Sequence, residues 1–410
     1  MRILYLTQVF ETLNDPGSDR HLFLCRYLVE HGHEVTAVTS NVDYKRAVAK
    51  YPKMGWRVRR TIDGVDVSYV YSYPHFRGSF LKRVFYFLTY MFSTLVEGAM
   101  LRRVELVYAV STPLTVGLLG YLLSRAHRCP FVFEVTDVWP DAAVAVGVVK
   151  NRMLVGAAGL LERFCYRKAS RIVVLTEGIR ENILAKGVPP AKLYLATNGI
   201  DKSLFPDTPD LDRPARVSLR EHGAVQPFVC MYVGAHGRYN SLETIIGAAE
   251  ALRADRRFEF VLVGDGDEKA KLEATARGLG LDNVRFLSPV GRSEVSVLLR
   301  SADCLLLPNR KGKFFNMNLP NKLFDFLASA RPIVVAGEGE SAEVVRRAGA
   351  GLVVAAGDGA AMAAAIIQIA NIEPAGREAV GRSGRDYVLK TYDREAICRR
   401  LAEVLEASVG

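Results

Sequence analysis

The chain has 410 residues, of which 50% are hydrophobic and 24% charged, and its formal net charge is +10 at pH 7. This length exceeds one ordinary core and this composition excludes a disordered chain, so we expect two globular domains. The positive charge indicates an anionic partner, such as a phosphate-bearing substrate or an anionic lipid. The sequence contains no zinc-finger-like module, and we therefore expect no nucleic-acid partner.

The cysteine and histidine patterns exclude two further classes of protein. Six scattered cysteines form no CxxC pair, and seven histidines form no HExxH motif. A disulfide scaffold and a structural zinc site are therefore excluded, and we expect a reducing compartment, no metal and no resident cofactor. The first residues, MRILYLTQVF, are typical of a buried strand and not of a signal peptide, so we expect a cytoplasmic location.

Short apolar runs alternate with helix-length segments along the chain. In the first half the runs are RILYLT, EVTAVTS, VDVSYV, LVYAVS, FVFEVT, RIVVLT and KLYLAT. In the second half they are FVCMYVG, FEFVLVG, VRFLS, CLLLP, PIVVAG and GLVVAA. Runs of β-branched residues that alternate with helices indicate parallel sheets covered on both faces, and two sets predict two doubly wound α/β domains.

Ligands of parallel sheets bind at the carboxyl ends of the strands, so polar residues just after a strand are the candidates for a site. After the first strand, Gly17 in NDPGSDRH could let backbone N–H groups approach a phosphate or a sugar, although a plain turn explains it equally well. After FVFEVT, Asp137 precedes the aromatic Trp139. A carboxylate beside an aromatic ring suits sugar binding or proton handling, and the alternative is a helix cap.

Residues 76–103 form an apolar, aromatic-rich run between basic residues that include Lys82 and Arg83. Glu97 interrupts this run, and a spanning helix would break the strand pattern around it. We expect a helix that lies on an anionic membrane surface, and a core helix of the first domain is the alternative.

A segment rich in Pro and Asp, residues 198–223, separates the two sets of strands. We therefore place an N-terminal domain at 1–203 and a C-terminal domain at 204–387. The helical pattern at 388–410 is expected to pack back on the N-terminal domain.

Two glycine-rich turns follow the first strands of the C-terminal domain. In GAHGRYNSLETII, Gly234 and Gly237 permit close backbone approach and Arg238 can reach an anion at the next helix start. The sequence is not a Walker loop, because the Gly-Lys-Ser/Thr ending is missing. In VGDGDEKAKL, Gly264 follows the next strand, where a tight turn is the alternative explanation.

The stretch from Phe314 to Val345 gathers polar residues at the ends of its elements. Lys322 and Asp325 lie on a helix that starts near Pro320. With Arg238, Lys322 could neutralise a diphosphate. Asp325 is a good ligand for a ribose diol, and stabilisation by the helix macrodipole in the first turn is the alternative. Ser341 and its neighbouring N–H groups lie at the start of another helix, where Glu338 and Glu340 could face a sugar.

Several of these pieces in their order resemble the retaining family-4 glycosyltransferases of the GT-B fold, especially the bacterial branch similar to the WbuB sugar transferases of surface-polysaccharide assembly. They include DVWPDAAVAVG, VLTEGIRENILAKGVPPAKL, LVGDGDEKAKLE and PNKLFDFLASARPIV. The resemblance implies two Rossmann-like domains whose sheets face a central cleft. It also implies transfer of a hexosyl or N-acetylhexosaminyl group from a nucleotide donor, expected to be UDP-linked, without a metal. The donor would bind the C-terminal domain and the acceptor the N-terminal one.

Carried onto this sequence, Asp325 takes the place of the second acid of the family's paired-glutamate motif, which holds the ribose. The place of the first acid falls on Asn316 when anchored on Pro320 and on Met317 by strict spacing. Asn316 carries no charge, but it can still bond sugar hydroxyls.

The resemblance leaves catalysis mainly to position and positive charge, supplied by Arg238 and Lys322, while Asp137 would orient the acceptor or the sugar. The donor contacts that we expect are Gly17, Gly234, Gly237, Gly264, Asn316, Asn318, Asp325 and Ser341.

Membrane docking through residues 76–103 would suit a polyprenyl-diphosphate-linked acceptor, with the protein peripheral to the inner face of the cell membrane. Two other functions stay open. One is a nucleotide-sugar epimerase of the same architecture, and the other is a catalytically weak sugar-nucleotide-binding assembly protein, which the missing first acid would explain.

Overall fold

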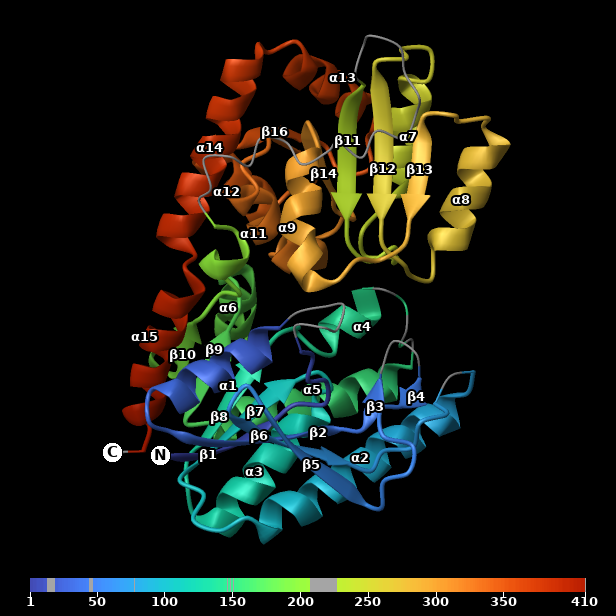
Figure 1. Cartoon of the computed structure of the whole chain (residues 1–410). Coiled ribbons are helices and arrows are strands. Elements are labelled where there is room, and N and C mark those ends of the chain that lie inside the picture. Colours follow the sequence, from blue (N-terminus) through green and yellow to red (C-terminus); the bar gives the residue numbers. More distant parts are fainter. Residues whose placement is uncertain are drawn as a thin grey trace. The chain divides into compact units, whose positions relative to one another are not determined.

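The computed structural model describes residues 1–12, 19–43, 47–76, 78–145, 147, 149, 151–206 and 227–409 (Figure 1). Within these ranges the chain divides into two compact units. The first unit contains residues up to Thr197 and returns from Glu395 onward, and the second runs from Asn198 to Arg394. Gly17 lies outside the described residues.

The first unit is built on one twisted sheet with the strand order β10-β9-β8-β7-β1-β2-β6-β5. Its strands are β1 (Arg2–Leu6), β2 (Glu34–Ser40), β5 (Arg57–Ile62), β6 (Val65–Val70), β7 (Leu106–Ser111), β8 (Phe131–Val135), β9 (Arg171–Val174) and β10 (Leu193–Leu195). All seven strands expected in this half are present and run parallel to one another. A short antiparallel pair, β3 (Val42–Asp43) and β4 (Val48–Ala49), lies beside them in sequence.

The sheet also has a strand that the sequence pattern did not predict. β5, with the sequence RVRRTI, pairs antiparallel with β6 at the edge of the sheet. Its three arginines break the apolar run, and an edge strand needs no continuous apolar run because it is partly exposed to water. The expectation of a purely parallel first sheet was therefore wrong at this edge.

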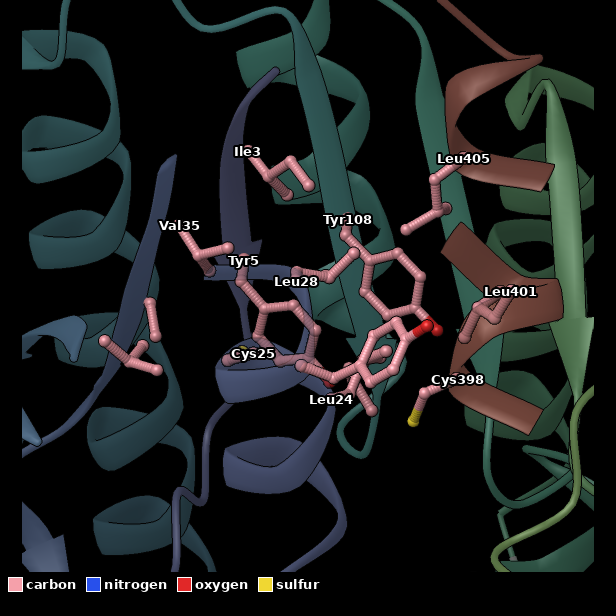
Figure 2. Close-up of a cluster of buried hydrophobic side chains, with 14 of the residues drawn as sticks. Ile3, Tyr5, Leu24, Cys25, Leu28, Val35, Tyr108, Cys398, Leu401 and Leu405 are labelled. Atoms are coloured by element: carbon pink, nitrogen blue, oxygen red, sulfur yellow. The ribbon is translucent and has the colours of Figure 1, made fainter. Parts of the chain in front are cut away.

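Helices cover both faces of this sheet. They are α1 (Arg20–Glu30), α2 (Phe80–Met100), α3 (Thr115–His127), α4 (Asp141–Ala145), α5 (Arg152–Lys168), α6 (Glu177–Ala185) and α15 (Arg394–Glu406), with a 3-10 turn at Pro190–Lys192. α1 and α15 pack on one face, and Figure 2 shows Cys398, Leu401 and Leu405 of α15 turned toward Tyr108. α2, α3, α5 and α6 pack on the other face. The last helix of the chain therefore belongs to the first unit.

α2 packs as a core helix on one side and is exposed on the other. Tyr86 and Tyr90 are fully buried. Glu97 is also buried, and its charge is compensated by Arg57 and Arg59 of β5. The charge that interrupts the apolar run therefore faces the protein, while other apolar residues of the helix face outward. Among the described residues, no helix is both long and apolar enough to cross a bilayer.

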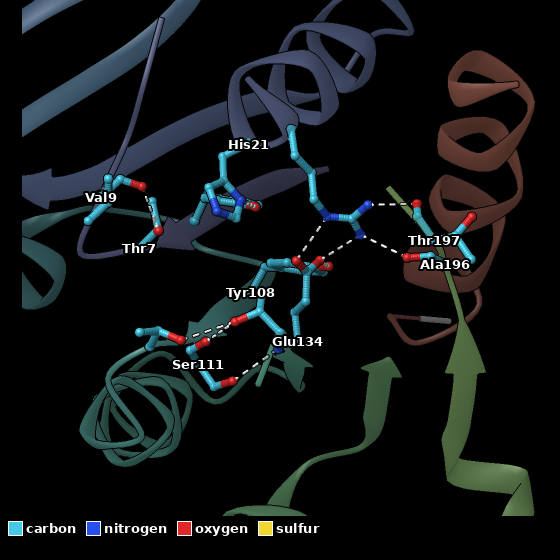
Figure 3. Close-up of polar contacts among 12 residues, drawn as sticks. Thr7, Val9, His21, Tyr108, Ser111, Glu134, Ala196 and Thr197 are labelled. Atoms are coloured by element: carbon cyan, nitrogen blue, oxygen red, sulfur yellow. Dashed lines mark hydrogen bonds and ion pairs between the residues drawn. The ribbon is translucent and has the colours of Figure 1, made fainter. Parts of the chain in front are cut away.

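A buried ion pair joins the start of α1 to the middle of the first sheet (Figure 3). Arg20 donates through Nε and Nη2 to the carboxylate of Glu134 at 3.1 and 3.2 Å, and its Nη1 donates to the carbonyl of Thr197 at 2.8 Å. The Tyr108 hydroxyl donates to the same carboxylate. Burial alone would raise the pKa of Glu134, but the charge and hydrogen bonds of Arg20 lower it below its usual range. The pair is therefore ionised, and it ties α1 to β8 and to the end of β10.

The second unit is built on a parallel sheet with the strand order β13-β12-β11-β14-β15-β16. The strands are β11 (Phe228–Val233), β12 (Phe258–Val263), β13 (Val284–Leu287), β14 (Cys304–Pro308), β15 (Ile333–Ala336) and β16 (Gly351–Val354). All six were predicted from the sequence. Because both sheets are wound in two directions from a central strand pair, the predicted fold of two doubly wound α/β domains is confirmed.

The helices of the second unit also form two layers. They are α7 (Glu243–Ala251), α8 (Lys269–Gly278), α9 (Arg292–Ser301), α10 (Lys313–Asn316), α11 (Asn321–Ala328), α12 (Glu340–Ala348), α13 (Gly359–Ala370) and α14 (Pro374–Thr391), with a 3-10 turn at Lys202–Leu204. α9, α11, α12 and α14 share one apolar cluster with the sheet, and α7, α8 and α13 share the other. α11 thus lies in the same layer as α9, and it starts at the carboxyl edge of the sheet.

The Arg20–Glu134 pair supports a prediction about stability. Replacing Arg20 with Met leaves a buried carboxylate without its cation, which should lower the free energy of unfolding by about 3–5 kcal/mol. Both tryptophans, Trp56 and Trp139, belong to the first unit, so tryptophan fluorescence during urea unfolding reports on this unit.

The exposed pair Arg2–Glu34 provides the control, because an exposed pair contributes about 0–1 kcal/mol. Equal, small losses in Arg20→Met and Arg2→Met would contradict the role of the buried pair.

Candidate functional site

The strand order of the second unit marks one crevice for a ligand. From β11 the chain proceeds to β12 and β13 on one side of the sheet, and from β14 it proceeds to β15 and β16 on the other. The loops after β11 and β14 therefore leave the sheet in opposite directions, which opens a crevice at the carboxyl ends of these strands. The turn 234–240 and the segment 309–322 lie at this point.

Two of the glycines predicted from the sequence are required here by their positive φ, and one of them also by backbone packing. Gly234 has a φ of 151° and Gly264 a φ of 147°. A Cβ on Gly264 would overlap the carbonyl of Gly234, and a Cβ on Gly234 would lie 2.9 Å from the Lys322 Nζ. The turns after β11 and β12 therefore touch through bare backbone. Gly237 has open space around it, so packing does not require a glycine there.

Lys322 is the second residue of α11, and its Nζ lies in the crevice beside Gly234. Nζ donates to the Tyr232 hydroxyl at 2.5 Å and to Asn240 Oδ1 at 2.7 Å, and the Tyr232 hydroxyl donates onward to the carbonyl of Ala235 at 2.8 Å. Burial lowers the pKa of Lys322 to about 7. Within the described parts of the chain, no carboxylate lies within ion-pair distance of Nζ. An ammonium has three N–H groups, so one donor remains for a ligand.

Arg238 lies on the same turn as Asn240 but is held differently. Its side chain is 71% exposed and pairs with Glu268 at 3.1 Å. The structure therefore brings Asn240, and not Arg238, to Lys322. The sequence offered no signal for Tyr232 or Asn240, because the contacts that give them a role come from a helix more than 80 residues away.

Asp325 does not lie in the first turn of its helix. α11 begins at Asn321, so Asp325 is its fifth residue, and the proposed macrodipole explanation was wrong. Arg292, the first residue of α9, grips the carboxylate with two hydrogen bonds, from Nη1 to Oδ2 at 2.5 Å and from Nη2 to Oδ1 at 2.8 Å. The two side chains are only 11% and 10% exposed.

Asn316, Asn318 and Ser341 come together where β14 and β15 end. The Ser341 hydroxyl donates to the carbonyl of Asn318 at 3.0 Å, and Asn316 Nδ2 donates to Glu338 at 3.5 Å. Gly339 has a φ of 76°, and a Cβ there would overlap the backbone of Asn316. The turn before α12 is thereby seated on the segment that precedes α11. The hydroxyl of Ser341 is used within the protein, which leaves the amide of Asn316 as the more exposed polar group.

Asp137 lies in the first unit, just after β8. Burial raises its pKa, and it makes no hydrogen bond or ion pair with the described residues. The helix-cap alternative is not supported, since no described N–H group donates to it. Trp139 packs against the apolar cluster under α2, α3 and α5 and is only partly exposed.

The first unit also contains a histidine that sequence reasoning missed. His21 Nδ1 forms a hydrogen bond of 2.7 Å with the hydroxyl of Tyr5 on β1. Burial lowers the pKa of His21 to about 4, so its imidazole is neutral at pH 7. The motif NDPGSDRH was noticed for its glycine. The hydrogen bond of the histidine depends on the direction of the Tyr5 side chain, which is defined only when β1 takes its place in the sheet.

The chemistry available in the second unit suits a ligand that carries phosphate next to hydroxyl groups. Lys322 offers a cation, and Asp325 offers a carboxylate three residues later on the same helix. Side chains three apart are neighbours on a helix surface. Across the described ranges, no group of three His, Cys, Asp or Glu side chains is placed to hold a metal ion.

Comparisons with known proteins show to which family the chain belongs. A family model described as "Glycosyl transferase 4-like domain" matches residues 20–199, and one described as "Glycosyl transferases group 1" matches residues 227–371. The two matches fall on one unit each and together cover more than half of the chain.

Among curated proteins, WcaI of Escherichia coli K12, named as a colanic acid biosynthesis glycosyl transferase, is 24% identical over 77% of this chain and 78% of its own. The 2-deoxystreptamine glucosyltransferase of Streptomyces kanamyceticus is 28% identical over 57% of this chain and 59% of its own.

Two solved structures show the same fold. Sucrose-phosphate synthase of Thermosynechococcus elongatus superposes with a TM-score of 0.78 at 18% identity, covering 99% of this chain and 98% of that one. Anabaena HepE, solved with UDP and glucose, gives 0.74 at 17% identity, covering 99% and 100%. Because both units match, in order, the two domains from which such enzymes are built, the chain belongs to the family-4 glycosyltransferases of the GT-B fold.

Proposed function

We propose that this glycosyltransferase moves a hexosyl or N-acetylhexosaminyl group from a UDP-linked donor to a hydroxyl of a polyprenyl-diphosphate-linked acceptor, with retention and without a metal. The observation that carries the proposal is the Lys322 ammonium at the switch point of the second sheet. It lies in a crevice without a carboxylate partner among the described residues. A cation in that position favours an anionic ligand such as a diphosphate.

The choice of donor and of pathway is supported by related proteins. HepE has also been solved in complex with UDP-glucose, which supports a uridine diphosphate donor. WcaI and the Erwinia amylovora protein AmsK are named for colanic acid and amylovoran biosynthesis, which supports a role in surface-polysaccharide assembly.

In the proposed complex, the diphosphate lies at Lys322 and the ribose diol at Asp325, on the next turn of the same helix. Asn316 faces the transferred sugar. Arg238 would have to leave Glu268 to reach the phosphates, so we assign the main electrostatic role to Lys322. Asp137, in the first unit, would orient the acceptor hydroxyl.

The proposed reaction needs no protein nucleophile. The bond between the anomeric carbon and the β-phosphate oxygen breaks, and the acceptor oxygen forms the new bond on the same face of the sugar. The acceptor proton passes to the departing diphosphate oxygen. Lys322 stabilises the charge that develops on this oxygen, which is electrostatic catalysis by a preorganised group.

We also propose that the helical layer α2, α3 and α5 docks on an anionic membrane. Leu81, Phe85, Leu88 and Phe92 follow each other by four, three and four residues and are 51–75% exposed, so they form one stripe along α2. The exposed apolar residues on the two neighbouring helices are Leu122, Met153, Leu154 and Leu160.

The charges of this layer favour the same partner. The two carboxylates on the three helices, Glu97 and Glu162, are buried and paired. The basic side chains exposed on these helices are Lys82, Arg83, Arg125, Arg152, Arg163, Arg167 and Lys168. A surface that joins apolar and basic side chains without an exposed acid is typical of binding to anionic lipid. A lipid-linked acceptor would be reached from such a position.

Lys322→Met should raise the dissociation constant of UDP about 10–100-fold, because it removes a charge-assisted hydrogen bond worth about 1.5–3 kcal/mol. Isothermal titration calorimetry measures the change. Arg238→Met is the matched control, and we expect it to change UDP affinity less than threefold. Equal affinity of wild type and Lys322→Met would refute the diphosphate site, and a larger effect of Arg238→Met would move the electrostatic role to that residue.

UDP binding should weaken as pH rises from 7 to 9. Lys322 has a pKa of about 7 in the free protein, and a neighbouring diphosphate raises the pKa of the ammonium in the complex. Binding above pH 7 therefore takes up a proton, and the dissociation constant should rise up to about tenfold per pH unit. The phosphate itself, with a second pKa of about 6, is fully ionised in this range. Isothermal titration calorimetry in buffers of different ionisation enthalpy measures the number of protons taken up on UDP binding. Lys322→Met should bind UDP without this proton uptake.

Charge reversal by Lys82→Glu and Arg83→Glu should release the protein from anionic vesicles. Each basic residue near such a surface contributes about 1 kcal/mol, so removing two should weaken binding at least about 30-fold. Co-sedimentation with phosphatidylglycerol-containing vesicles measures the affinity of the protein for the membrane surface. Lys271→Glu and Arg277→Glu, at exposed positions of α8 in the second unit, give the same change in net charge and should have little effect. Unchanged sedimentation of the α2 variant would remove this docking surface.

A further inference from the structure

The ion pair between Arg292 and Asp325 is placed where the nucleoside half of a donor would lie. Arg292 opens α9, which follows β13, and Asp325 lies on α11, which follows β14. These two helices pack on the same face of the sheet. The pair therefore bridges two elements that border the crevice, one turn of α11 away from Lys322.

The geometry of the pair leaves the carboxylate able to bind more donors. The guanidinium group of Arg292 donates one hydrogen bond to each oxygen of Asp325 and so occupies one lone pair on each. An ionised carboxylate has about four lone-pair sites, so about two remain. Because both oxygens are gripped by a planar fork, their direction is defined before a ligand arrives.

The pair also solves an electrostatic problem of the proposed complex. A carboxylate one helical turn from a bound diphosphate would repel it. Arg292 balances the charge of Asp325, so the carboxylate can accept hydrogen bonds from a diol without weakening the phosphate site.

We infer that Arg292 is a positioning residue of the donor site, which acts through Asp325 on the ribose hydroxyls. This inference rests on the proposed function, because it needs a nucleoside diphosphate in the crevice. A carboxylate with the shorter Asp side chain can serve a ribose here because the arginine holds it in place.

The test compares two ligands that differ only in the ribose hydroxyls, UDP and 2′,3′-dideoxy-UDP. Wild type should prefer UDP at least tenfold. Arg292→Lys keeps the charge but loses the fork, so it should weaken UDP about tenfold and the dideoxy compound less than twofold. Asp325→Asn should reduce the preference in the same way. Arg292→Gln serves as a second variant if Arg292→Lys does not fold, with folding checked by thermal unfolding.

Arg385→Lys is the matched control, since Arg385 is a buried arginine of the same unit that donates to the carbonyls of Ala328 and Phe205. It should lower the melting temperature and leave the preference for UDP unchanged. If wild type binds UDP but Arg292→Lys weakens both ligands equally, or neither, Arg292 has only a structural role and the inference fails alone. If wild type binds none of UDP, GDP and ADP, the proposed function fails and the inference fails with it.

Discussion

The ammonium of Lys322 has two neutral hydrogen-bond partners, Tyr232 and Asn240, and within the described residues it has no counter-anion. A cation that is partly withdrawn from water without an anion is costly, and its pKa falls to about 7 as a result. The surrounding backbone keeps it in place: Gly234 leaves room for Nζ, and the turn after β12 supports the turn after β11. The arrangement of the crevice depends on this one charge, because a bound diphosphate would supply the missing anion.

Several other buried charges among the described residues are paired, and each of these pairs ties together elements that are distant in sequence. Arg20 and Glu134 join α1 to β8, and Glu97 joins α2 to β5. Arg292 and Asp325 join α9 to α11 by the same type of bond. The contrast with Lys322 separates structural ionic groups from a group available to a ligand. Because Asp325 belongs to a pair, the role that we propose for it in binding depends on Arg292 as well.

The first unit distributes its side chains unequally between the two faces of its sheet. α15 returns from the second unit to cover one face, and its leucines are buried there. On the opposite face, α2 and α5 keep large apolar side chains exposed, while the two acids of α2, α3 and α5 are buried. Glu97 explains how one helix serves both purposes, since its charge is neutralised inward by Arg57 and Arg59 and the outer surface stays free of negative charge.

Local pattern was enough to find thirteen strands and the doubly wound class, because a strand buried on both faces must be a continuous apolar run whatever surrounds it. Local pattern also led to Lys322 and Asp325, since a helix that follows a strand of a parallel sheet begins near the carboxyl edge of that sheet. It failed at β5, where a partly exposed edge strand needs no apolar run. It also failed at Asn240, Arg292 and His21, whose partners lie on other elements. The sequence could not tell that Lys322, and not Arg238, enters the crevice, or that Asp325 is already bound to an arginine. Both depend on side-chain contacts between elements that are distant in sequence, and only the packed structure decides such contacts.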